Sequence, residues 1–448
     1  DRLLTLLVEV RLEIDRVFLD VREHEVRELG HAGLGVTVSS RGVAVHGTEV
    51  AVTVNERIMQ RKRLRHAHHR VVNRCVAVRM IPAEHITDGR CRLAVGLVRG
   101  YADYIPIFLS ETQRLYRCGA VPCDVAMIQV SEPDKHGYVS LGTSVDATLA
   151  AVETAKTVIA VVNKYVPRSF GDAIIPMSKI DMFVHDDTPL IEAPFSEPNE
   201  TELKIGKYCA ELIEDGATLQ MGIGAIPNAV LSQLNDHKNL GIHTEMFADG
   251  VLPLVRSGVI NGEAKNIDKG MMVSTFLMGS KEVYDFIDDN PGVLMKDVGY
   301  TNDPYIISKN DRVTAINSAL QVDITGQVSA DSLGTKFWSG VGGQIDFVYG
   351  ASLSKGGKAI IAMPSITNKG VSKIVDKLLP GAGVVTTRNH IHWFVTEYGA
   401  VDLYGKSLQE RARLLISVAH PSAREELDRA AFERYGSHHH YIKSYMGM

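Results

Sequence analysis

Short apolar runs alternate with segments of helical character through most of this chain, and that alternation constrains the fold more than any other feature. Apolar runs of about 4–8 residues between turn signals are typical of buried strands. The expected strands are 104–109, 125–130 and 157–162, and the expected helices are 111–116 and 144–155. Units of this length predict an α/β fold with open, mostly parallel sheets that carry helices on both faces.

A second set of such units surrounds a single carboxylate, Glu245. Apolar runs at 217–226 and 229–234 precede the segment GIHTEMFADG (241–250), and a glycine-rich turn lies between Met221 and Ala225. The pattern predicts a strand, a turn, a helix and a second strand with Glu245 near its end. Ligands of open α/β sheets bind outside the carboxyl ends of the strands. A glutamate there can act as a nucleophile if backbone N–H groups face it, and residues 222–225 could supply them, which indicates acyl chemistry.

The chain divides into two lobes by these signals. A polar, proline-bearing passage at 194–200 is typical of a linker, and a helix is expected at 202–215. We therefore predict a first lobe at 100–195, a second lobe at 200–435 and a tail at 436–448. The segments 137–143 and 326–335 echo each other, which favours two lobes of similar topology; the alternative is that both are ordinary turns rich in Gly and Ser.

Residues 1–99 differ in composition from the rest of the chain. They contain 16 arginines and one lysine, whereas the remainder contains 11 arginines and 20 lysines. Three interpretations are open: a basic accessory arm, a divergent part of the first lobe, or residues translated from another frame or strand. The lack of clear caps and amphipathic periods favours the last interpretation and predicts poor order.

Charge and composition argue against several classes of protein. A net charge of -5 over 448 residues offers no basic stripe for nucleic acid. No apolar run reaches the roughly 20 residues of a membrane helix. The cysteines are odd in number and lack Cys-x-x-Cys spacing, and the histidines at 66–69 and 438–440 are expected to be solvated. We therefore expect a cytoplasmic protein with free thiols, no metal site, no nucleic-acid partner and no membrane span.

Several catalytic signatures are missing from the sequence. There is no G-x-S-x-G elbow, no G-x-x-x-x-G-K-[ST] loop and no H-E-x-x-H helix. The segment GIGAIP (222–227) has proline where a dinucleotide fingerprint needs its third glycine, and GVGGQ (340–344) also fails. Both glycine loops instead suit close approach of backbone to a ligand, with simple tight turns as the alternative.

Five segments together resemble the acetyl-CoA hydrolase/transferase family: 220–250, 326–335, 339–347, VTEYG (395–399) and AHP (419–421). The resemblance as a whole covers about residues 100–435, and within the family it is greatest to the 4-hydroxybutyrate and butyryl-CoA:acetate CoA-transferases. The resemblance implies two lobes of the CoA-transferase or NagB/RpiA-like fold, in a homodimer or larger homo-oligomer. Residues 1–99 do not resemble the family's opening strands.

The resemblance also implies an activity. Glu245 would be the nucleophile of a ping-pong CoA-transferase that passes through a glutamyl-CoA thioester, with acyl-CoA and short carboxylates as substrates and no permanently bound cofactor. The residues implied to bind CoA or stabilise the oxyanion are Gln220, Met221, Gly222, Ile223, Gly224, Asn302, Leu320, Gly342 and Gly343. For Leu320 a plain core position is the alternative.

Two other functions remain open. An acyl-CoA hydrolase would use the same glutamate, and no motif separates it from a transferase. A non-catalytic sensor on a related fold would have no need of Glu245.

Four further polar side chains are expected to lie outside the catalytic machinery or at its edge. We expect structural roles for Glu397 and His420, a role for Asp249 in capping or orienting the loop after Glu245, and either CoA phosphate or solvent next to Lys281.

Overall fold

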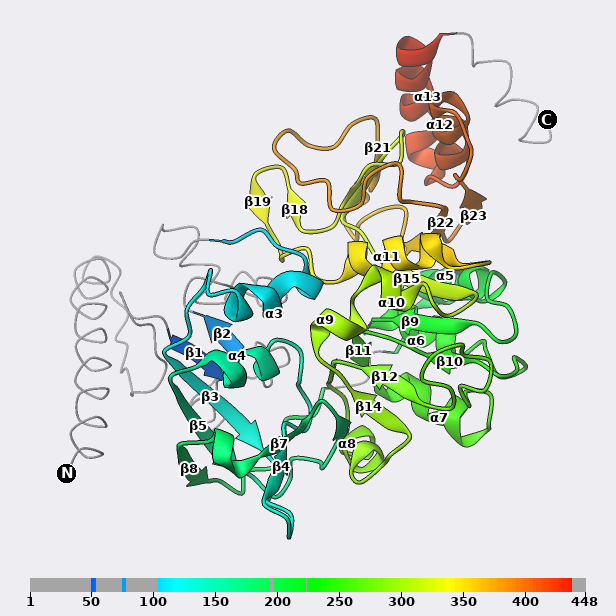
Figure 1. Cartoon of the computed structure of the whole chain (residues 1–448). Coiled ribbons are helices and arrows are strands. Elements are labelled where there is room, and N and C mark those ends of the chain that lie inside the picture. Colours follow the sequence, from blue (N-terminus) through cyan, green and yellow to red (C-terminus); the bar gives the residue numbers. More distant parts are fainter. Residues whose placement is uncertain (1–49, 54–74, 78–103, 194–196, 223, 437–448) are drawn as a thin grey trace, which may run out of the picture.

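The computed structural model of the chain describes residues 50–53, 75–77, 104–193, 197–222 and 224–436 (Figure 1). Four sequence-based expectations therefore fall outside the described residues, wholly or in part. They concern the order of most of segment 1–99, part of the linker at 194–196, the position of Ile223, and the tail beyond residue 436.

The first lobe is built on a five-stranded sheet with the order β2-β1-β3-β5-β8. Its strands are β2 (Cys75–Ala77), β1 (Val50–Thr53), β3 (Val125–Val130), β5 (Thr157–Val162) and β8 (Met182–His185). All neighbours are parallel except β1 and β2. The helices are α3 (Leu109–Arg117), α4 (Thr148–Thr154) and the 3-10 turn Met177–Lys179. Two short strands, β4 (Tyr138–Ser140) and β7 (Ile174–Pro176), form an antiparallel pair.

The second lobe is built on a six-stranded sheet with the order β10-β9-β15-β20-β22-β23, parallel except at β23. Its strands are β10 (Gly241–Ile242), β9 (Thr218–Met221), β15 (Val313–Asn317), β20 (Lys358–Ala362), β22 (Trp393–Thr396) and β23 (Gly399–Asp402). The inner strands β9, β15 and β20 are buried almost throughout, as expected for a parallel sheet with helices on both faces.

The second lobe also contains ten helical elements among its described residues. They are α5 (Glu200–Ala210), α6 (Ala225–Leu231), α7 (Leu252–Arg256), α8 (Lys281–Ile287), α9 (Val298–Thr301), α10 (Pro304–Ile307), α11 (Gln344–Leu353), α12 (Leu408–Ser417), α13 (Pro421–Tyr435) and the 3-10 turn Asp249–Val251. Capping boxes fix the starts of α5, through Asn199 and Glu202, and of α12, through Ser407 and Glu410.

Short strands complete the lobe. They are β11 (Met246–Phe247) with β13 (Phe276–Leu277); β12 (Met272–Ser274) with β14 (Val293–Met295); β16 (Gln321–Asp323) with β17 (Val328–Ser329) and β21 (Ile374–Val375); and β18 (Ser332–Leu333) with β19 (Lys336–Phe337). No helix among the described residues has the length and apolar character needed to cross a bilayer.

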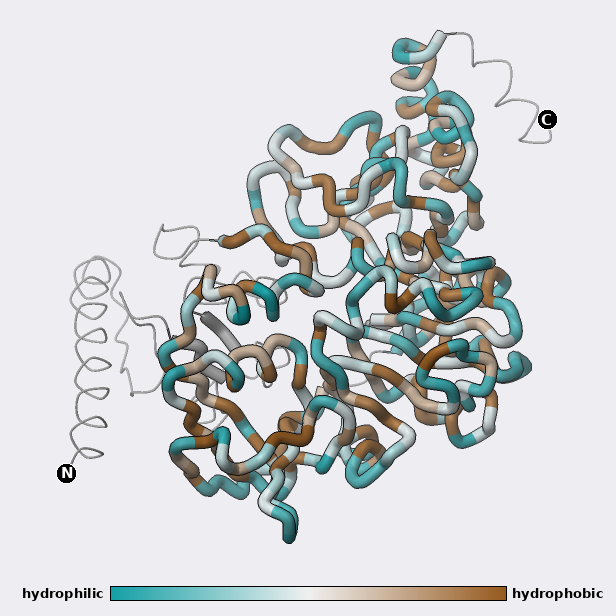
Figure 2. The backbone as a smooth tube through the Cα atoms, in the orientation of Figure 1, coloured by the Kyte–Doolittle hydropathy of each residue, from teal (hydrophilic) through white to brown (hydrophobic). Residues whose placement is uncertain are grey.

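The two lobes are continuous in structure. Strand β6 (Phe170–Gly171) of the first lobe pairs in parallel with β14 of the second. Gly171 is needed there because a Cβ would lie 2.6 Å from the carbonyl oxygen of Met295. One core cluster also contains Ile128 of β3 together with Leu219 of β9, and hydrophobic stretches follow β3 and β5 in Figure 2. The position of the first lobe is therefore fixed against the sheet that carries Glu245.

The predicted α/β architecture with mostly parallel sheets is confirmed. The strands at 125–130 and 157–162 match β3 and β5, and the helix at 111–116 lies within α3. The helix predicted at 144–155 begins later, at Thr148, because residues before it bond to the second lobe through Val145 N and Thr275 O. The helix predicted at 202–215 is α5, which starts at Glu200 and ends at Ala210.

The strand predicted at 104–109 is wrong. Residues 104–108 have no regular secondary structure and lead directly into α3. Pro106 has no N–H to offer a ladder, so the segment packs by its side chains instead. Ile105 and Ile107 pack against the core, and the ring of Tyr104 lies 5.2 Å from that of Phe337 on β19.

Candidate functional site

Glu245 lies three residues beyond β10, at the carboxyl edge of the six-stranded sheet. Its carbonyl oxygen accepts hydrogen bonds from the backbone N–H groups of Thr275 (3.1 Å) and Phe276 (3.2 Å) and from the Ser274 hydroxyl (3.0 Å). Three donors on one carbonyl fix the backbone from which the side chain projects. The residue itself is half-buried, so this sheet edge presents a carboxylate on rigid backbone.

Asn302 holds that carboxylate. The amide Nδ2 of Asn302 donates to Oε2 of Glu245 at 2.9 Å. Asn302 is fully buried and follows the last residue of α9. A donor so placed stabilises the ionised carboxylate and restricts its orientation.

Gly343 lies immediately beneath the same carboxylate. A Cβ at this position would be 1.9 Å from Oε2 of Glu245 and 2.3 Å from Nδ2 of Asn302. Gly343 has a φ of -96°, so space and not backbone conformation requires glycine. At the neighbouring Gly342 the backbone conformation requires glycine and space does not, since its φ is 57° and a Cβ there would have open space.

The first glycine loop is tied to Glu245 through Thr244. The Thr244 hydroxyl donates to the carbonyl of Met221 at 2.9 Å and accepts from the Met221 N–H at 3.3 Å. The buried Gln220 uses its Oε1 to accept from Asn317 at the end of β15 (3.0 Å). Beyond them, Gly222 and Gly224 border open space, and Gly224 has a φ of 114°. A Cβ built at either glycine would therefore have no heavy atom within 4 Å.

The structure thus brings part of the predicted set into direct contact. Glu245, Asn302 and Gly343 touch one another. Met221 is linked to the residue before Glu245, and Gly342 adjoins Gly343. Leu320 is half-buried between β15 and β16, where its N–H bonds to Ser329 O (2.9 Å). Ile223 lies outside the described residues.

Two contributors to the site escaped prediction. Asp346, on the first turn of α11, lies 3.4 Å from the Asn302 amide through its Oδ2. Ser110 of α3 donates to Asp346 from its hydroxyl (2.8 Å) and its N–H (3.1 Å). The position of Asp346, three residues beyond Gly343, could have identified it. Nothing in the local sequence indicated Ser110, which comes from the other lobe.

The surroundings of Asp346 perturb its ionisation. Burial is the main reason that the pKa of its carboxyl rises to about 7, and the nearby charge of Glu245 adds to the rise. The bonds from Ser110 and Asn302 act in the opposite direction. Near neutral pH this acid is therefore divided between its neutral and charged forms.

A buried histidine supports the backbone behind Asn302. The Nε2 of His243 lies 2.8 Å from the carbonyl oxygen of Thr301, which can only accept, so Nε2 carries the proton. Burial lowers the pKa of His243 to about 4, and the charge of Lys265 contributes. The ring is therefore neutral at pH 7. It connects the segment that carries Glu245 to the residue preceding Asn302.

The four further candidates have other partners. Asp249 accepts from the N–H of Ser280 at the start of α8 (3.0 Å), so it links the loop after Glu245 to that helix. Lys281 forms an ion pair with Asp285 on the same helix. The carboxylate of Glu397 accepts from the Ser365 N–H at 2.9 Å.

His420 caps the start of α13, where its Nδ1 accepts from the Ser422 N–H. That cap is the structural role expected for it. Within the described part of the chain, no group of three or more His, Cys, Asp or Glu side chains is placed to hold a metal ion.

Comparisons with known proteins identify relatives of this chain. Residues 89–192 match the acetyl-CoA hydrolase/transferase N-terminal domain, and residues 279–431 match the C-terminal domain. A 4-hydroxybutyrate coenzyme A transferase of Clostridium kluyveri is 54% identical over 329 residues, which are 73% of this chain and 77% of that protein. A succinyl-CoA:acetate/propanoyl-CoA:succinate CoA transferase of Fasciola hepatica is 52% identical over 351 residues, 78% of this chain and 73% of that protein.

A solved structure agrees with the sequence relatives. The crystal structure of 4-hydroxybutyrate CoA-transferase from Porphyromonas gingivalis matches with a TM-score of 0.68 and 42% identity. The match covers 77% of this chain and 84% of that chain.

Proposed function

Because this chain belongs to the acetyl-CoA hydrolase/transferase family and is an enzyme of the CoA-transferase type, we propose that it transfers coenzyme A from a short-chain acyl-CoA to acetate or another short carboxylate. The donor and acceptor would be of the 4-hydroxybutyrate or butyrate kind, in keeping with the names of the relatives. One observation carries the proposal. A half-buried glutamate at a sheet edge has one oxygen held by Asn302 and lies against a glycine.

The proposed reaction begins with the ionised Glu245. Its oxygen attacks the thioester carbonyl of the acyl-CoA, the C–S bond breaks, and the products are an acyl-glutamyl anhydride and CoA thiolate. The thiolate then attacks the glutamyl carbonyl of the anhydride. The bond between the glutamyl carbonyl carbon and the bridging oxygen breaks, the first carboxylate leaves with that oxygen, and a glutamyl-CoA thioester remains. A second carboxylate attacks this thioester and the steps run in reverse.

A glutamate suits this chemistry because it is the chemical equivalent of the carboxylates that it exchanges. Each thioester formed is therefore close in energy to the one consumed. A serine would form an ester instead, and returning an ester to the thioester level with a carboxylate is uphill. The nucleophile must also be ionised, and the N–H of Asn302 favours that form.

The neighbouring loops would bind CoA and stabilise the oxyanion. We assign that role to residues 220–224 and to Gly342 and Gly343, whose backbone lies beside Glu245 or borders open space. One correctly placed donor contributes about 3–4 kcal/mol to such an intermediate. Leu320 would line the channel for the CoA arm.

The second candidate is hydrolysis of the acyl-CoA by the same glutamate. The family includes hydrolases by its description, and the two reactions differ only in whether water or a carboxylate consumes the intermediate. The 54% and 52% identical relatives are both named transferases, which favours transfer.

The proposed function also includes a cytoplasmic location and assembly into a homodimer or larger homo-oligomer.

The test is the dependence of CoA release on an acceptor. The full chain is incubated with butyryl-CoA, with and without acetate, and both acetyl-CoA and free CoA are followed by chromatography. A transferase forms acetyl-CoA in step with butyrate and releases little CoA without acetate. Continuous CoA release without acetate would instead establish hydrolysis. The Glu245→Gln variant is the control, and turnover that it retained would contradict the assigned nucleophile.

A further inference from the structure

The amide of Asn302 lies between two carboxylates. Its Nδ2 donates to Oε2 of Glu245 at 2.9 Å and lies 3.4 Å from Oδ2 of Asp346, a longer and weaker bond. An amide nitrogen has two N–H groups, so both contacts can form together. Glu245 and Asp346 thus share one donor nitrogen.

This arrangement fixes which way the amide points. With Asp346 in its charged form, a flipped amide would bring Oδ1 against two carboxylates and lose both bonds. In the observed orientation Oδ1 is buried and has no hydrogen-bond partner among the described residues. The carboxyl group of Asp346 therefore favours the same amide orientation that directs Nδ2 towards the nucleophile.

Asp346 is in turn held by the first lobe. The Ser110 hydroxyl donates to Oδ1 at 2.8 Å and the Ser110 N–H donates to Oδ2 at 3.1 Å. The preceding residue, Leu109, donates from its N–H to the carbonyl of Gly342 at 3.2 Å. The first turn of α3 is thus bonded both to Asp346 and to the glycine loop beneath Glu245.

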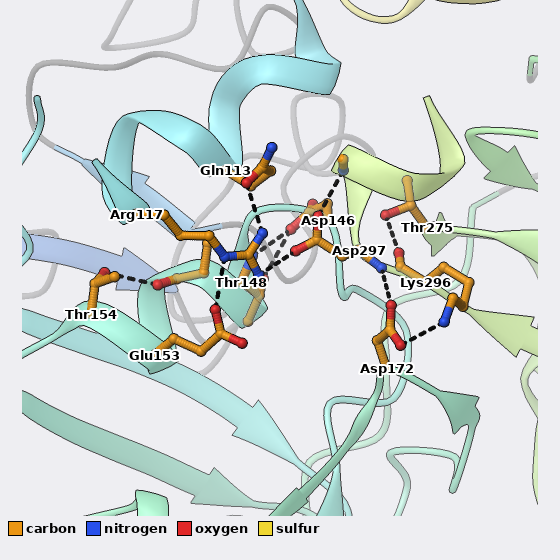
Figure 3. A network of polar contacts seen from close by, with 12 residues as sticks. Gln113, Arg117, Asp146, Thr148, Glu153, Thr154, Asp172, Thr275, Lys296 and Asp297 are labelled. Carbon is orange, nitrogen blue, oxygen red and sulfur yellow. Dashed lines mark hydrogen bonds and ion pairs between the residues drawn. The ribbon is translucent and has the colours of Figure 1, made fainter. Parts of the chain in front are cut away.

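The other end of α3 contacts the helix that precedes Asn302. Arg117 donates to Asp297 at 2.8 Å and to Glu153 at 2.8 Å (Figure 3). Asp297 caps α9 by accepting from Gly299 N. Helix α3 lies so near α9 that a Cβ at Gly299 would be 2.7 Å from the Gln113 amide. Helix α3 of the first lobe therefore contacts both Asp346, which bonds to the Asn302 amide, and α9, the helix that precedes Asn302.

We propose that Asp346 is a positioning residue for the reaction at Glu245, and that Ser110 holds Asp346 so that docking of the first lobe orients the Asn302 amide. The inference rests on the proposed role of Glu245 as nucleophile. Neither Ser110 nor Asp346 touches the reacting atoms. Their effect passes through Asn302, so it falls on the chemical step and not on the binding of CoA.

The chain offers a matched test at Ser110. The Ser110→Thr and Ser110→Val variants have side chains of the same shape and differ in the hydroxyl. Thr112→Val on the same helix turn is the control, because the Thr112 hydroxyl bonds only weakly to its own helix, to Phe108 O at 3.4 Å. We expect Ser110→Val to have a kcat about tenfold below that of Ser110→Thr, with KM for acyl-CoA within about twofold. Thr112→Val should match the unmodified chain.

Equal kcat values for the two Ser110 variants, in an unmodified chain that transfers CoA, would overturn the proposal while leaving the proposed function intact. A parallel change in KM and kcat would also overturn it, because that would show a role in binding.

A crystal structure of Asp346→Ala gives a readout that does not depend on activity. We expect the Asn302 amide to rotate away from Glu245, with Nδ2 beyond hydrogen-bonding distance of Oε2. Retention of the 2.9 Å bond in that variant would refute the positioning role even if the chain transferred no CoA. Absence of CoA transfer by the unmodified chain would instead contradict the proposed function itself, on which the positioning role depends.

Discussion

The carboxylate of Glu245 lies against the backbone of Gly343, so closely that a Cβ at residue 343 would be 1.9 Å from Oε2. The two residues are far apart in the sequence, and they meet because the turn after β10 and the start of α11 reach the same edge of the sheet. Any larger residue at position 343 would therefore displace the Glu245 carboxylate from its present position.

The first prediction concerns that glycine. Gly343→Ala should lower kcat by about a hundredfold or more, because the methyl group displaces both the Glu245 carboxylate and the Asn302 amide. Steady-state rates with butyryl-CoA and acetate measure the effect, and thermal unfolding checks the fold. Gly292→Ala is a suitable control, since its Cβ would approach only the Asn290 side chain, at 3.1 Å. Undiminished activity of Gly343→Ala would show that Glu245 works in another orientation.

The second prediction concerns Asn302. Removing a donor to a charged group costs about 1.5–3 kcal/mol, so Asn302→Ala should lower kcat about 10–100-fold. Single-turnover formation of the covalent intermediate measures this step directly. Asn261→Ala serves as a comparison, because Asn261 bonds to Asn239 on the surface. A kcat equal to that of the unmodified chain would show that Asn302 does not assist the reaction at Glu245.

The third prediction concerns pH and the stability of the fold. Burial raises the pKa of Asp346 to about 7, whereas an aspartate in an unfolded chain has a pKa of about 3.9. Between these values the folded chain binds more protons than the unfolded chain. Its free energy of unfolding therefore falls as pH rises, by up to about 1.4 kcal/mol per pH unit. This contribution is fully present below about pH 4 and is lost as pH rises through about 7.

Asp346→Asn removes that titration. The free energy of unfolding of the unmodified chain, minus that of the variant, should decrease steadily from pH 4 to pH 7.5. Urea unfolding across the pH series measures the difference, and Asp236→Asn at the exposed surface serves as control. Glu245 is the charged group that faces Asp346, and it is present in both chains. A difference that stays constant with pH would show that Asp346 has an ordinary pKa.

The regular elements could largely be predicted from the sequence. Val125–Val130 and Thr157–Val162 are apolar runs of strand length, and each forms a strand over the full length predicted. Residues 104–109 have the same apolar character but form no strand, because pairing depends on a neighbouring backbone and Pro106 cannot complete a ladder. The pattern of apolar residues predicts which residues are buried, but it does not predict which part of the chain packs against them.

The site was predictable only in part, for a similar reason. Glu245 and the glycine loops stand out because a carboxylate and exposed amides at strand ends have few structural uses. Asn302 came from family resemblance alone, and the structure places it 2.9 Å from Glu245. Ser110 and Asp346 are separated by 236 residues, so their contact exists only once the two lobes dock. The roles assigned in catalysis and CoA binding to Glu245, Asn302, Leu320 and the two glycine loops stay predictions.

The covalent state of Glu245 is the most direct measure of this account. The full chain is incubated with butyryl-CoA without acceptor, treated with borohydride, digested and analysed by mass spectrometry. Reduction of a glutamyl-CoA thioester to the alcohol replaces one oxygen by two hydrogens, so the peptide should become about 14 Da lighter. We predict this change at Glu245, and its absence from Asn302→Ala on the timescale of a single turnover. An unmodified Glu245 in a chain that nevertheless transfers CoA would contradict the account.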